Sequence, residues 1–311
     1  MISDTAGRLR ANIQKVIVGK DEVIDQLLAA VLCEGHLLLE DVPGIGKTTL
    51  ARALAASLGC NFSRIQFTPD LLPSDVTGLN WFNQKEQWFE YKPGPIISQV
   101  ILADEINRAT PRTQSALLEA MQERQVTIDG VTRSLPRPFI VLATQNPVEL
   151  EGTFPLPEAQ IDRFLMRISI GYPSETEENA ILERFRISDP LPELKPIVSP
   201  EQVVDMQEFR RQIKVVEPVR EYIVRVARST REHAEIELGA SPRATLALYQ
   251  AAQAWAAIRG RDYVIPDDVK KLAPSVLTHR LMIAPQAQLR GRKVEHLVAD
   301  IVNSVPVPVE N

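Results

Sequence analysis

Cysteine is scarce in this sequence. Only Cys33 and Cys60 occur among its 311 residues. Two thiols are too few for a disulfide framework and make a thiolate metal site improbable. Both lie in segments with helical patterns or at helix ends, where we expect buried, apolar thiols.

An excess of basic residues is also missing. Lys and Arg number 35 against 40 Asp and Glu, which gives a formal net charge of −5. The generally basic surface of proteins that track nucleic acid is therefore absent. Long apolar runs are missing too: LLAAVLC is far too short to span a bilayer, and the N-terminus has no apolar core for export. We expect a cytoplasmic protein with no membrane span and disfavour nucleic acid as a partner.

Short apolar runs separated by helical patterns dominate the first half of the chain. An amphipathic helix is expected over residues 20–32, from apolar residues at helical spacing. The runs of strand length are HLLLE (36–40), SRIQF (63–67), VILAD (100–104), FIVLAT (139–144) and MRISI (166–170). This alternation predicts an α/β domain over residues 1–171, with a parallel sheet sandwiched by helices.

The pattern changes after Gly171. Ser174 and Glu177 form a capping box for a helix, and four prolines then follow closely, which predicts a helix and a stiff linker over residues 172–200. From there on we find only helical periodicity. Residues 201–311 are therefore expected to form a smaller, all-helical domain.

The stretch LLLEDVPGIGKTTLARAL resembles a phosphate-binding loop between a strand and a helix. It contains the Gly-Lys-Thr that closes the GxxxxGK[ST] pattern, which predicts that Lys47 reaches the outer phosphates of ATP and that Thr48 ligates Mg²⁺. An ordinary glycine-rich turn is the alternative. The residues expected to hold the nucleotide are Asp41, Val42, Pro43, Gly44, Ile45, Gly46, Lys47, Thr48 and Thr49.

Asp41 departs from this pattern, because it stands where the first glycine is required. We expect the departure to cost little. Aspartate tolerates left-handed backbone geometry and can cap its own turn, while Gly44 supplies conformational freedom further along the loop. The loop is still expected to bind a triphosphate.

Polar residues end two of the predicted strands. Asp104 and Glu105 follow VILA, and Asn146 follows the next strand in VLATQNP. The carboxyl ends of parallel strands face the ligand crevice, so we expect Asp104 to hold Mg²⁺ and Glu105 to activate the attacking water. Asn146 would bond the γ-phosphate and that water. A solvated Asp-Glu turn and a plain Asn-Pro turn are the structural alternatives.

Two arginines complete the predicted site. Arg163 closes a short helix before the last strand, where it could be a surface ion pair or an arginine finger for the nucleotide of a neighbouring subunit. Arg243 lies in the first turn of a helix, where a cation opposes the helix dipole. We favour the finger for Arg163 and, for Arg243, contact with the γ-phosphate over an ion pair with Glu235 or Glu237.

These elements, in this order, resemble the MoxR family of AAA+ ATPases. The strings that carry the resemblance are LLLEDVPGIGKT, ADEINRATPRTQSALLEAMQE, ATQNP and FPLPEAQIDRF. It implies an AAA+ P-loop NTPase core followed by a helical lid, in a ring that is usually hexameric with active sites between subunits. It also implies that Val18 and Gly19 contact the base. Whether Arg108 or Arg112 shares the role of Arg163 stays open.

Two further segments predict hairpins within the α/β domain, at about 68–95 and 124–136. The second contains Asp129-Gly130, a strong tight-turn signal. The first gathers Trp81, Phe82, Trp88, Phe89 and Tyr91 in a chain with 5% aromatic residues. Such residues could pack on the core, or they could line the pore or face of a ring and contact a client.

We therefore expect a Mg²⁺-dependent ATPase whose lid and hairpins move with the nucleotide state. The resemblance implies a chaperone-like factor that remodels or matures partner proteins. It extends to von Willebrand factor A domain proteins as partners and to metal or cofactor insertion. The competing hypotheses are a nucleic-acid motor of the same superfamily and a nucleotide-binding switch with little turnover. Glu105 and Asn146 argue against the switch, because a pure binder needs neither.

Overall fold

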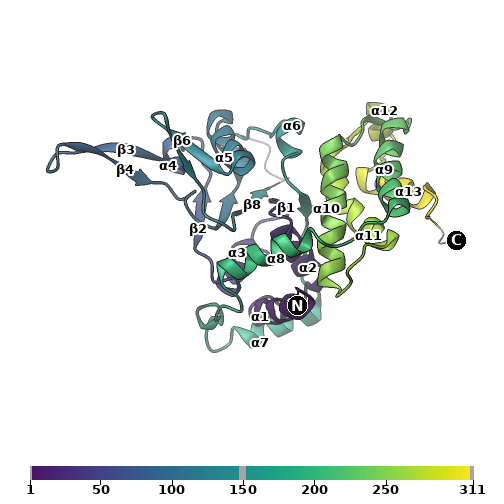
Figure 1. The fold of residues 1–311 in the computed structure, drawn as a ribbon, viewed down its shortest axis with the longest axis horizontal. Helices are drawn as coiled ribbons and strands as arrows, with labels where there is room; N and C mark the ends of the chain where they lie inside the picture. The colour runs from purple at the N-terminus through teal and green to yellow at the C-terminus, as the bar shows by residue number, and fades with distance from the viewer. Residues whose placement is uncertain (1, 147–151, 309–311) are drawn as a thin grey trace.

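A five-stranded parallel sheet forms the centre of the computed structural model, which describes residues 2–146 and 152–308 (Figure 1). The strand order is β2–β5–β8–β1–β9. The five predicted runs form these strands, β1 (Leu37–Glu40), β2 (Phe62–Gln66), β5 (Val100–Asp104), β8 (Ile140–Gln145) and β9 (Met166–Ile168). The predicted α/β class is confirmed. Because the strands are parallel, their carboxyl ends meet at one edge of the sheet.

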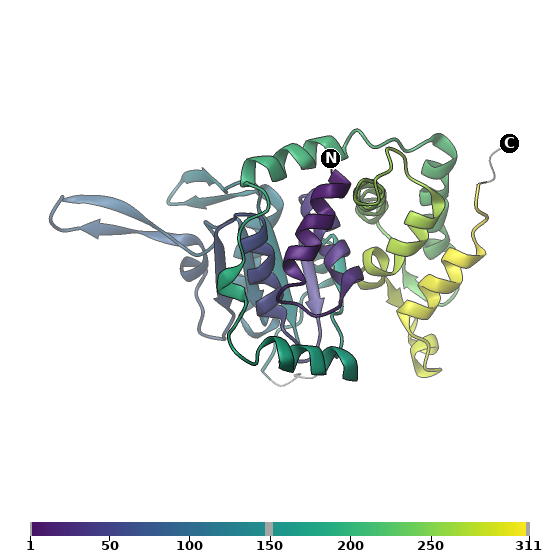
Figure 2. The ribbon, with the colours of Figure 1, turned by 90° about the horizontal axis from the view of Figure 1, so that it is seen from below.

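Each face of the sheet packs against its own set of helices. Leu37 and Leu39 of β1 belong to a hydrophobic cluster with α1, α2 and α3, whereas Leu38 belongs to a second cluster with α5. This alternation is the period of two expected for a strand covered on both faces. The helices are α1 (Ile2–Ile13), α2 (Asp21–Leu32), α3 (Lys47–Ser57) and α5 (Pro111–Glu123). Figure 2 shows the dark purple N-terminal helices gathered on one side of the sheet.

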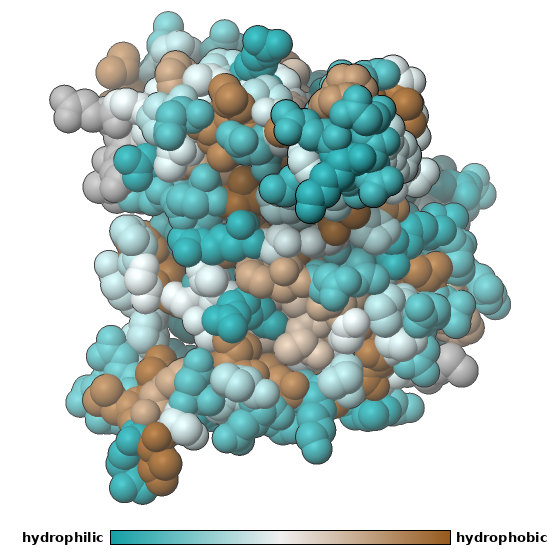
Figure 3. All heavy atoms as spheres, turned by 90° about the vertical axis from the view of Figure 1, so that its left-hand side faces the viewer, coloured by the Kyte–Doolittle hydropathy of each residue, from teal (hydrophilic) through white to brown (hydrophobic). Residues whose placement is uncertain are grey.

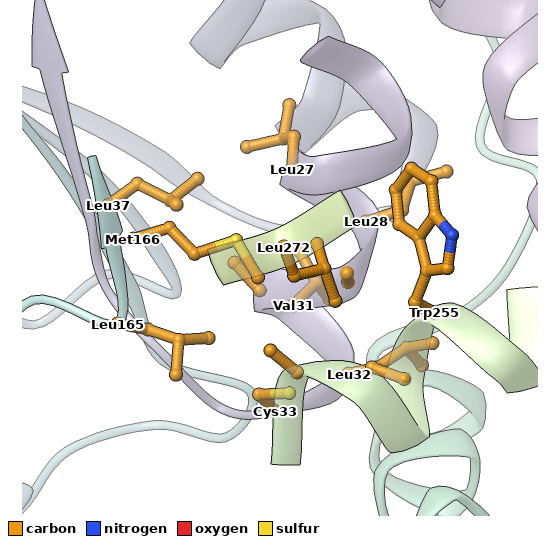
Figure 4. Packing of buried hydrophobic residues seen from close by; sticks show 14 of the residues in the cluster. Leu27, Leu28, Val31, Leu32, Cys33, Leu37, Leu165, Met166, Trp255 and Leu272 are labelled. Carbon is orange, nitrogen blue, oxygen red and sulfur yellow. The ribbon is translucent and has the colours of Figure 1, made fainter. Parts of the chain in front are cut away.

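The C-terminal helices pack directly on this core rather than standing apart from it. Trp255 and Leu272 lie against residues of α2 such as Leu28 in one continuous cluster (Figure 4). α8 also rests on α2, because the side-chain amide of Gln207 donates to the carbonyl of Val31 at 2.8 Å. The elements concerned are α8 (Pro200–Arg210), α9 (Glu217–Glu232), α10 (Pro242–Ile258), α11 (Pro266–Leu277), α12 (Pro285–Leu289) and α13 (Val294–Ser304).

The predicted helical lid is confirmed, with one departure from the expectation of helices alone in residues 201–311. A short antiparallel sheet joins β10 (Ile236–Leu238) to β11 (Met282–Ile283). Strands of two or three residues are too short to produce a recognisable alternation in the sequence. The predicted capping box upstream is present: Ser174 and Glu177 bond each other's backbone N–H groups at the start of α7 (Glu175–Arg184).

Two antiparallel hairpins extend from the core at the predicted places. The first joins β3 (Gly78–Asn83) to β4 (Trp88–Pro93) after the short helix α4 (Pro73–Thr77), and the second joins β6 (Gln125–Ile128) to β7 (Val131–Ser134). Figure 1 shows the first hairpin reaching far from the rest of the molecule.

Most aromatic side chains of the first hairpin do not pack on the core. Trp88 is 58% exposed and Phe89 67% exposed. Tyr91 is the exception, since it packs against the second hydrophobic cluster, and the Arg133 guanidinium of the second hairpin lies 4.2 Å from its ring centroid. Figure 3 faces this end of the molecule and shows a hydrophilic surface interrupted by separate hydrophobic patches. The core-packing alternative therefore does not describe Trp88 and Phe89.

Both cysteines are free thiols, Cys33 buried and Cys60 half-buried. Burial raises the pKa of both thiols to about 12, which keeps them protonated at neutral pH. Within the described parts of the chain, no helix has the length and apolar character needed to cross a membrane.

His36 makes the stability of the core depend on pH. Its Nδ1 accepts from the Val141 N–H, so its Nε2 donates to the Met121 carbonyl. Burial, with a smaller effect of Arg124, lowers the pKa of His36 from 6.5 to about 3. The unfolded chain therefore binds a proton that the folded chain excludes, and stability is lost as pH falls from 6.5 towards 3.

We expect the free energy of unfolding to fall by about 2 kcal/mol from this residue between pH 6.5 and pH 5. Urea unfolding at several pH values measures the effect. In the variant His36→Gln, which keeps a donor and an acceptor without a titrating ring, the slope of stability against pH should be shallower. Equal slopes in the two proteins would contradict this assignment.

Candidate nucleotide site

The loop between β1 and α3 forms an open cradle of backbone. Gly44 and Gly46 have φ angles of 86° and 92°, in the left-handed region that favours glycine. A Cβ atom on either glycine would meet no heavy atom within 4 Å, so the space beside both is open. The N-terminus of α3 directs its free N–H groups towards that space.

Asp41 does not play the role expected from the sequence. Its φ angle is not positive, so it does not replace glycine by adopting left-handed geometry. Its buried carboxylate instead accepts from the Ser169 hydroxyl at 2.8 Å and from the N–H groups of Ile170 and Gly171. Asp41 therefore fixes the start of the loop to the chain that follows β9. Its carbonyl accepts from the Lys47 ammonium at 2.6 Å.

The predicted chemical groups meet in one polar cavity of about 410 Å³. Its walls come from the loop and from the ends of β2, β5 and β8. Burial lowers the pKa of Lys47, and the opposing charges of Asp41, Asp104 and Glu105 limit that shift. The lining residues are Pro43, Gly44, Gly46, Lys47, Thr48, Thr49, Arg64, Gln66, Asp104, Glu105, Thr144 and Asn146.

A second cavity of about 390 Å³ adjoins the first, and both share Pro43, Gly44, Gly46 and Thr49. Its walls are mostly apolar. Val18 lines it as predicted, whereas Gly19 is not in its lining and packs against Glu177. Ile45 of the predicted loop lines it too, whereas sequence reasoning missed Ile170, Tyr172, Ile181 and Phe185. A flat apolar base fits here, next to a polar cavity for the phosphates.

Backbone and hydroxyl contacts fix Asp104 and Glu105 at the end of β5. The Thr144 hydroxyl of β8 donates to Asp104 Oδ1 at 2.7 Å and accepts from the Glu105 N–H at 2.8 Å. Glu105 itself has a φ angle of 57°, an uncommon geometry for a residue other than glycine. That turn carries its side chain into the polar cavity. The structural alternative of a merely solvated turn does not fit this arrangement.

Two residues of β2 were not predicted. Gln66 donates to Glu105 Oε2 at 2.8 Å, and Arg64 donates to Asp104 Oδ2 from both Nε at 3.0 Å and Nη2 at 2.6 Å. Arg108 also reaches Glu105 Oε2, at 3.1 Å. Arg108 therefore lies in the cavity region of its own chain, while Arg112 is exposed at the start of α5.

Arg163 and Arg243 lie elsewhere. Neither lines the two cavities, and both line a separate depression of about 240 Å³. Arg243 approaches Asp162, with 3.9 Å between Nε and Oδ2, and not Glu235, which pairs with Arg292. In this structure Arg243 therefore does not line the polar cavity of its own chain. It lines the same depression as Arg163 instead.

Asp162, the residue before Arg163, connects this segment of the core to the lid. The buried Arg280 of the 3₁₀ turn η3 (Thr278–Arg280) donates to Asp162 Oδ1 at 2.8 Å and to the Leu165 carbonyl at 3.1 Å. The Ser241 hydroxyl, which caps α10, also donates to the Asp162 carboxylate. The segment that carries Arg163 is thus held by lid residues on both sides.

The donor set fits magnesium and a triphosphate. A Thr48 hydroxyl and an Asp104 carboxylate are hard oxygen ligands, and Mg²⁺ is usually bound by few protein oxygens together with phosphates and water. The open glycine cradle and Lys47 offer N–H groups and one cation to the phosphates. When bound, the ion neutralises the phosphate charge and polarises the terminal phosphoryl group.

Comparison with known proteins agrees with this geometry. Residues 36–166 match the profile of the ATPase family associated with various cellular activities (AAA), and residues 228–301 match that of the AAA lid domain. Protein YeaC of Bacillus subtilis is 52% identical over 98% of this chain and 95% of its own. Chaperone MoxR1 of Mycobacterium tuberculosis is 42% identical over 99% of this chain and 83% of its own.

The fold agrees as well. The crystal structure of an ATPase candidate from Cytophaga hutchinsonii has a TM-score of 0.93 and 39% identity, and the match covers 99% of this chain and 96% of that one. The sequence identity to these proteins extends over nearly whole chains, and the matched family profiles give an AAA core followed by an AAA lid. Both findings indicate the same family. The chain belongs to the MoxR family of AAA+ ATPases.

Proposed function

We propose that this protein hydrolyses ATP with Mg²⁺ and uses the energy to remodel or mature partner proteins. The observation that supports it is the meeting of Lys47, Thr48, Asp104, Glu105 and Asn146 in one polar cavity beside an apolar one. Binding alone would need the loop but not a carboxylate and an amide placed beyond the phosphates.

Each group has a defined task in this proposal. The Lys47 ammonium and the loop N–H groups hold the outer phosphates, and Asp104 and Thr48 hold the metal ion. Glu105 accepts the proton of the attacking water, and Asn146 orients that water against the terminal phosphate. In this structure Glu105 is tied to Gln66 and Arg108, so it must leave these donors to act as a base.

The arginines act in a neighbouring subunit. Arg163 and Arg243 share one depression away from the cavities of their own chain, so we propose that both face the nucleotide of the next subunit in a ring. A hexamer is the ring expected from the family. Asp162 precedes Arg163 in the chain and its carboxylate pairs with Arg243 and Arg280 of the lid, so the finger and the lid would approach that nucleotide together.

The client is proposed to be a protein. The exposed Trp88 and Phe89 offer apolar contacts at the end of the long hairpin, and few cations accompany them. Proteins with von Willebrand factor A domains, and the insertion of a metal or cofactor into them, are the partners and task that the resemblance suggests. Glu105→Gln protein loaded with ATP should retain such a partner, and recovery of nucleic acid instead would contradict this assignment.

The ATP site itself is tested by replacing Lys47. Lys47→Ala should weaken the binding of a fluorescent ATP analogue about 10- to 100-fold, because a charged hydrogen bond to the phosphates contributes about 1.5–3 kcal/mol. Arg52→Ala, on the exposed face of α3, is the matched control and should bind as the wild type does. Wild-type protein that fails to bind ATP, or equal binding by Lys47→Ala, would refute the proposal.

A further inference from the structure

Arg64 occupies an unexpected position in the polar cavity. Its side chain is 48% exposed there and comes from β2, the strand beside β5. Both Nε and Nη2 donate to one oxygen, Oδ2 of Asp104. The other oxygen, Oδ1, accepts from the Thr144 hydroxyl. Oδ2 is therefore the oxygen of Asp104 that is paired with a cation in this structure.

The strand geometry holds Arg64 in that position. Arg64 and Gln66 are two residues apart on β2, so their side chains lie on the same face of the strand. The Arg64 Nη2 also donates to Gln66 Oε1 at 2.5 Å, and the Gln66 amide donates to Glu105. The guanidinium is thus oriented by two acceptors, Asp104 and Gln66, and does not hang freely in solvent.

A surface ion pair of this exposure contributes little to stability, typically below about 1 kcal/mol. The pair matters because its carboxylate is that of Asp104. Asp104 is the acidic residue that the cavity offers to Mg²⁺, and an oxygen that accepts two guanidinium N–H groups has little capacity left for a metal-bound water. Arg64 and the metal ion therefore compete for the same oxygen.

We propose that the Arg64 guanidinium occupies the metal site in the absence of metal, where it pairs with Asp104. When Mg²⁺ binds together with the nucleotide, Arg64 releases Asp104 to the ion. This inference rests on the proposed ATPase function. Arg64 then sets how strongly nucleotide binding depends on magnesium. Without metal it compensates the negative charge of Asp104 close to the phosphates, and with metal the ion takes over that task.

The test compares ATP binding with and without metal. In Arg64→Ala, binding of a fluorescent ATP analogue in EDTA should weaken about tenfold, because Asp104 then faces the phosphates uncompensated. Binding with saturating Mg²⁺ should stay close to the wild-type affinity. The ratio of the two dissociation constants should therefore rise about tenfold, and the Mg²⁺ concentration for half-saturation should fall.

Two variants separate charge from folding. Arg64→Lys restores the positive charge and should recover most of the binding in EDTA. Arg228→Ala, which removes an arginine from an ion pair on α9, should leave the ratio unchanged. Wild-type protein that binds no ATP would refute the proposed function. Wild-type protein that binds ATP, with the same metal dependence in Arg64→Ala or no recovery in Arg64→Lys, would refute this inference alone.

Discussion

Replacing Glu105 with glutamine should slow ATP hydrolysis about 10²- to 10⁴-fold, the usual contribution of a positioned general base. The amide keeps the size of the side chain and can still accept a hydrogen bond from Gln66, but it cannot take a proton from water. ATP affinity should stay within a few-fold of the wild type, because Glu105 lies beyond the residues that hold the phosphates. Phosphate release and binding of a fluorescent ATP analogue measure the two effects separately.

Glu119→Gln is the matched control for this prediction. Glu119 lies exposed on α5, so the same chemical change should leave turnover unaltered there. If Glu105→Gln hydrolyses ATP at the wild-type rate while both proteins bind it, Glu105 is not the base. If that shared rate is also little above the uncatalysed rate, the chain behaves as a nucleotide-binding switch. That outcome would leave the loop and Lys47 in place and remove only the catalytic assignment.

The residues that the sequence allowed us to predict share one property: they lie at or beyond the carboxyl ends of strands of the sheet. Lys47 follows β1, Asp104 and Glu105 end β5, and Asn146 follows β8. Parallel strands bring their carboxyl ends to one edge whatever their order, so residues at those ends meet without any knowledge of which strands are neighbours. The order of an α/β core and a helical lid was predicted from a different signal, the change from strand-length apolar runs to helical periodicity along the sequence.

The residues that were missed, or that make other contacts than expected, depend on pairing and packing between distant segments. Arg64 matters only because β2 pairs with β5, and the register places Gln66 opposite Asp104. Asp41 bonds the chain after β9, and its position in the loop pattern does not reveal that contact. Arg243 was placed by its helix position alone, whereas the buried Arg280 and its hydrogen bonds determine where the lid holds it.

Arg163→Ala should lower the turnover number about 10³- to 10⁵-fold, as the loss of an arginine finger does in phosphoryl transfer. Arg163 lines neither cavity of its own chain, so ATP binding by a single subunit should change little. A loss of turnover with binding preserved already separates a finger from a surface ion pair. Arg137→Ala, which removes an exposed arginine from an ion pair with Glu34, should keep wild-type turnover.

Mixing two inactive variants distinguishes action in a neighbouring subunit from action within one chain. Arg163→Ala keeps Glu105, and Glu105→Gln keeps Arg163, so a ring containing both has interfaces with one intact copy of each. Equal mixing in a ring of head-to-tail contacts should restore about a quarter of the wild-type rate, because a working site needs its cavity from Arg163→Ala and its neighbour from Glu105→Gln, and each is present about half the time. If Arg163 acted on the nucleotide of its own chain, no mixture would be more active than its components. Separation of the mixed species by size, with activity measured on each fraction, would assign the rescued turnover to the ring.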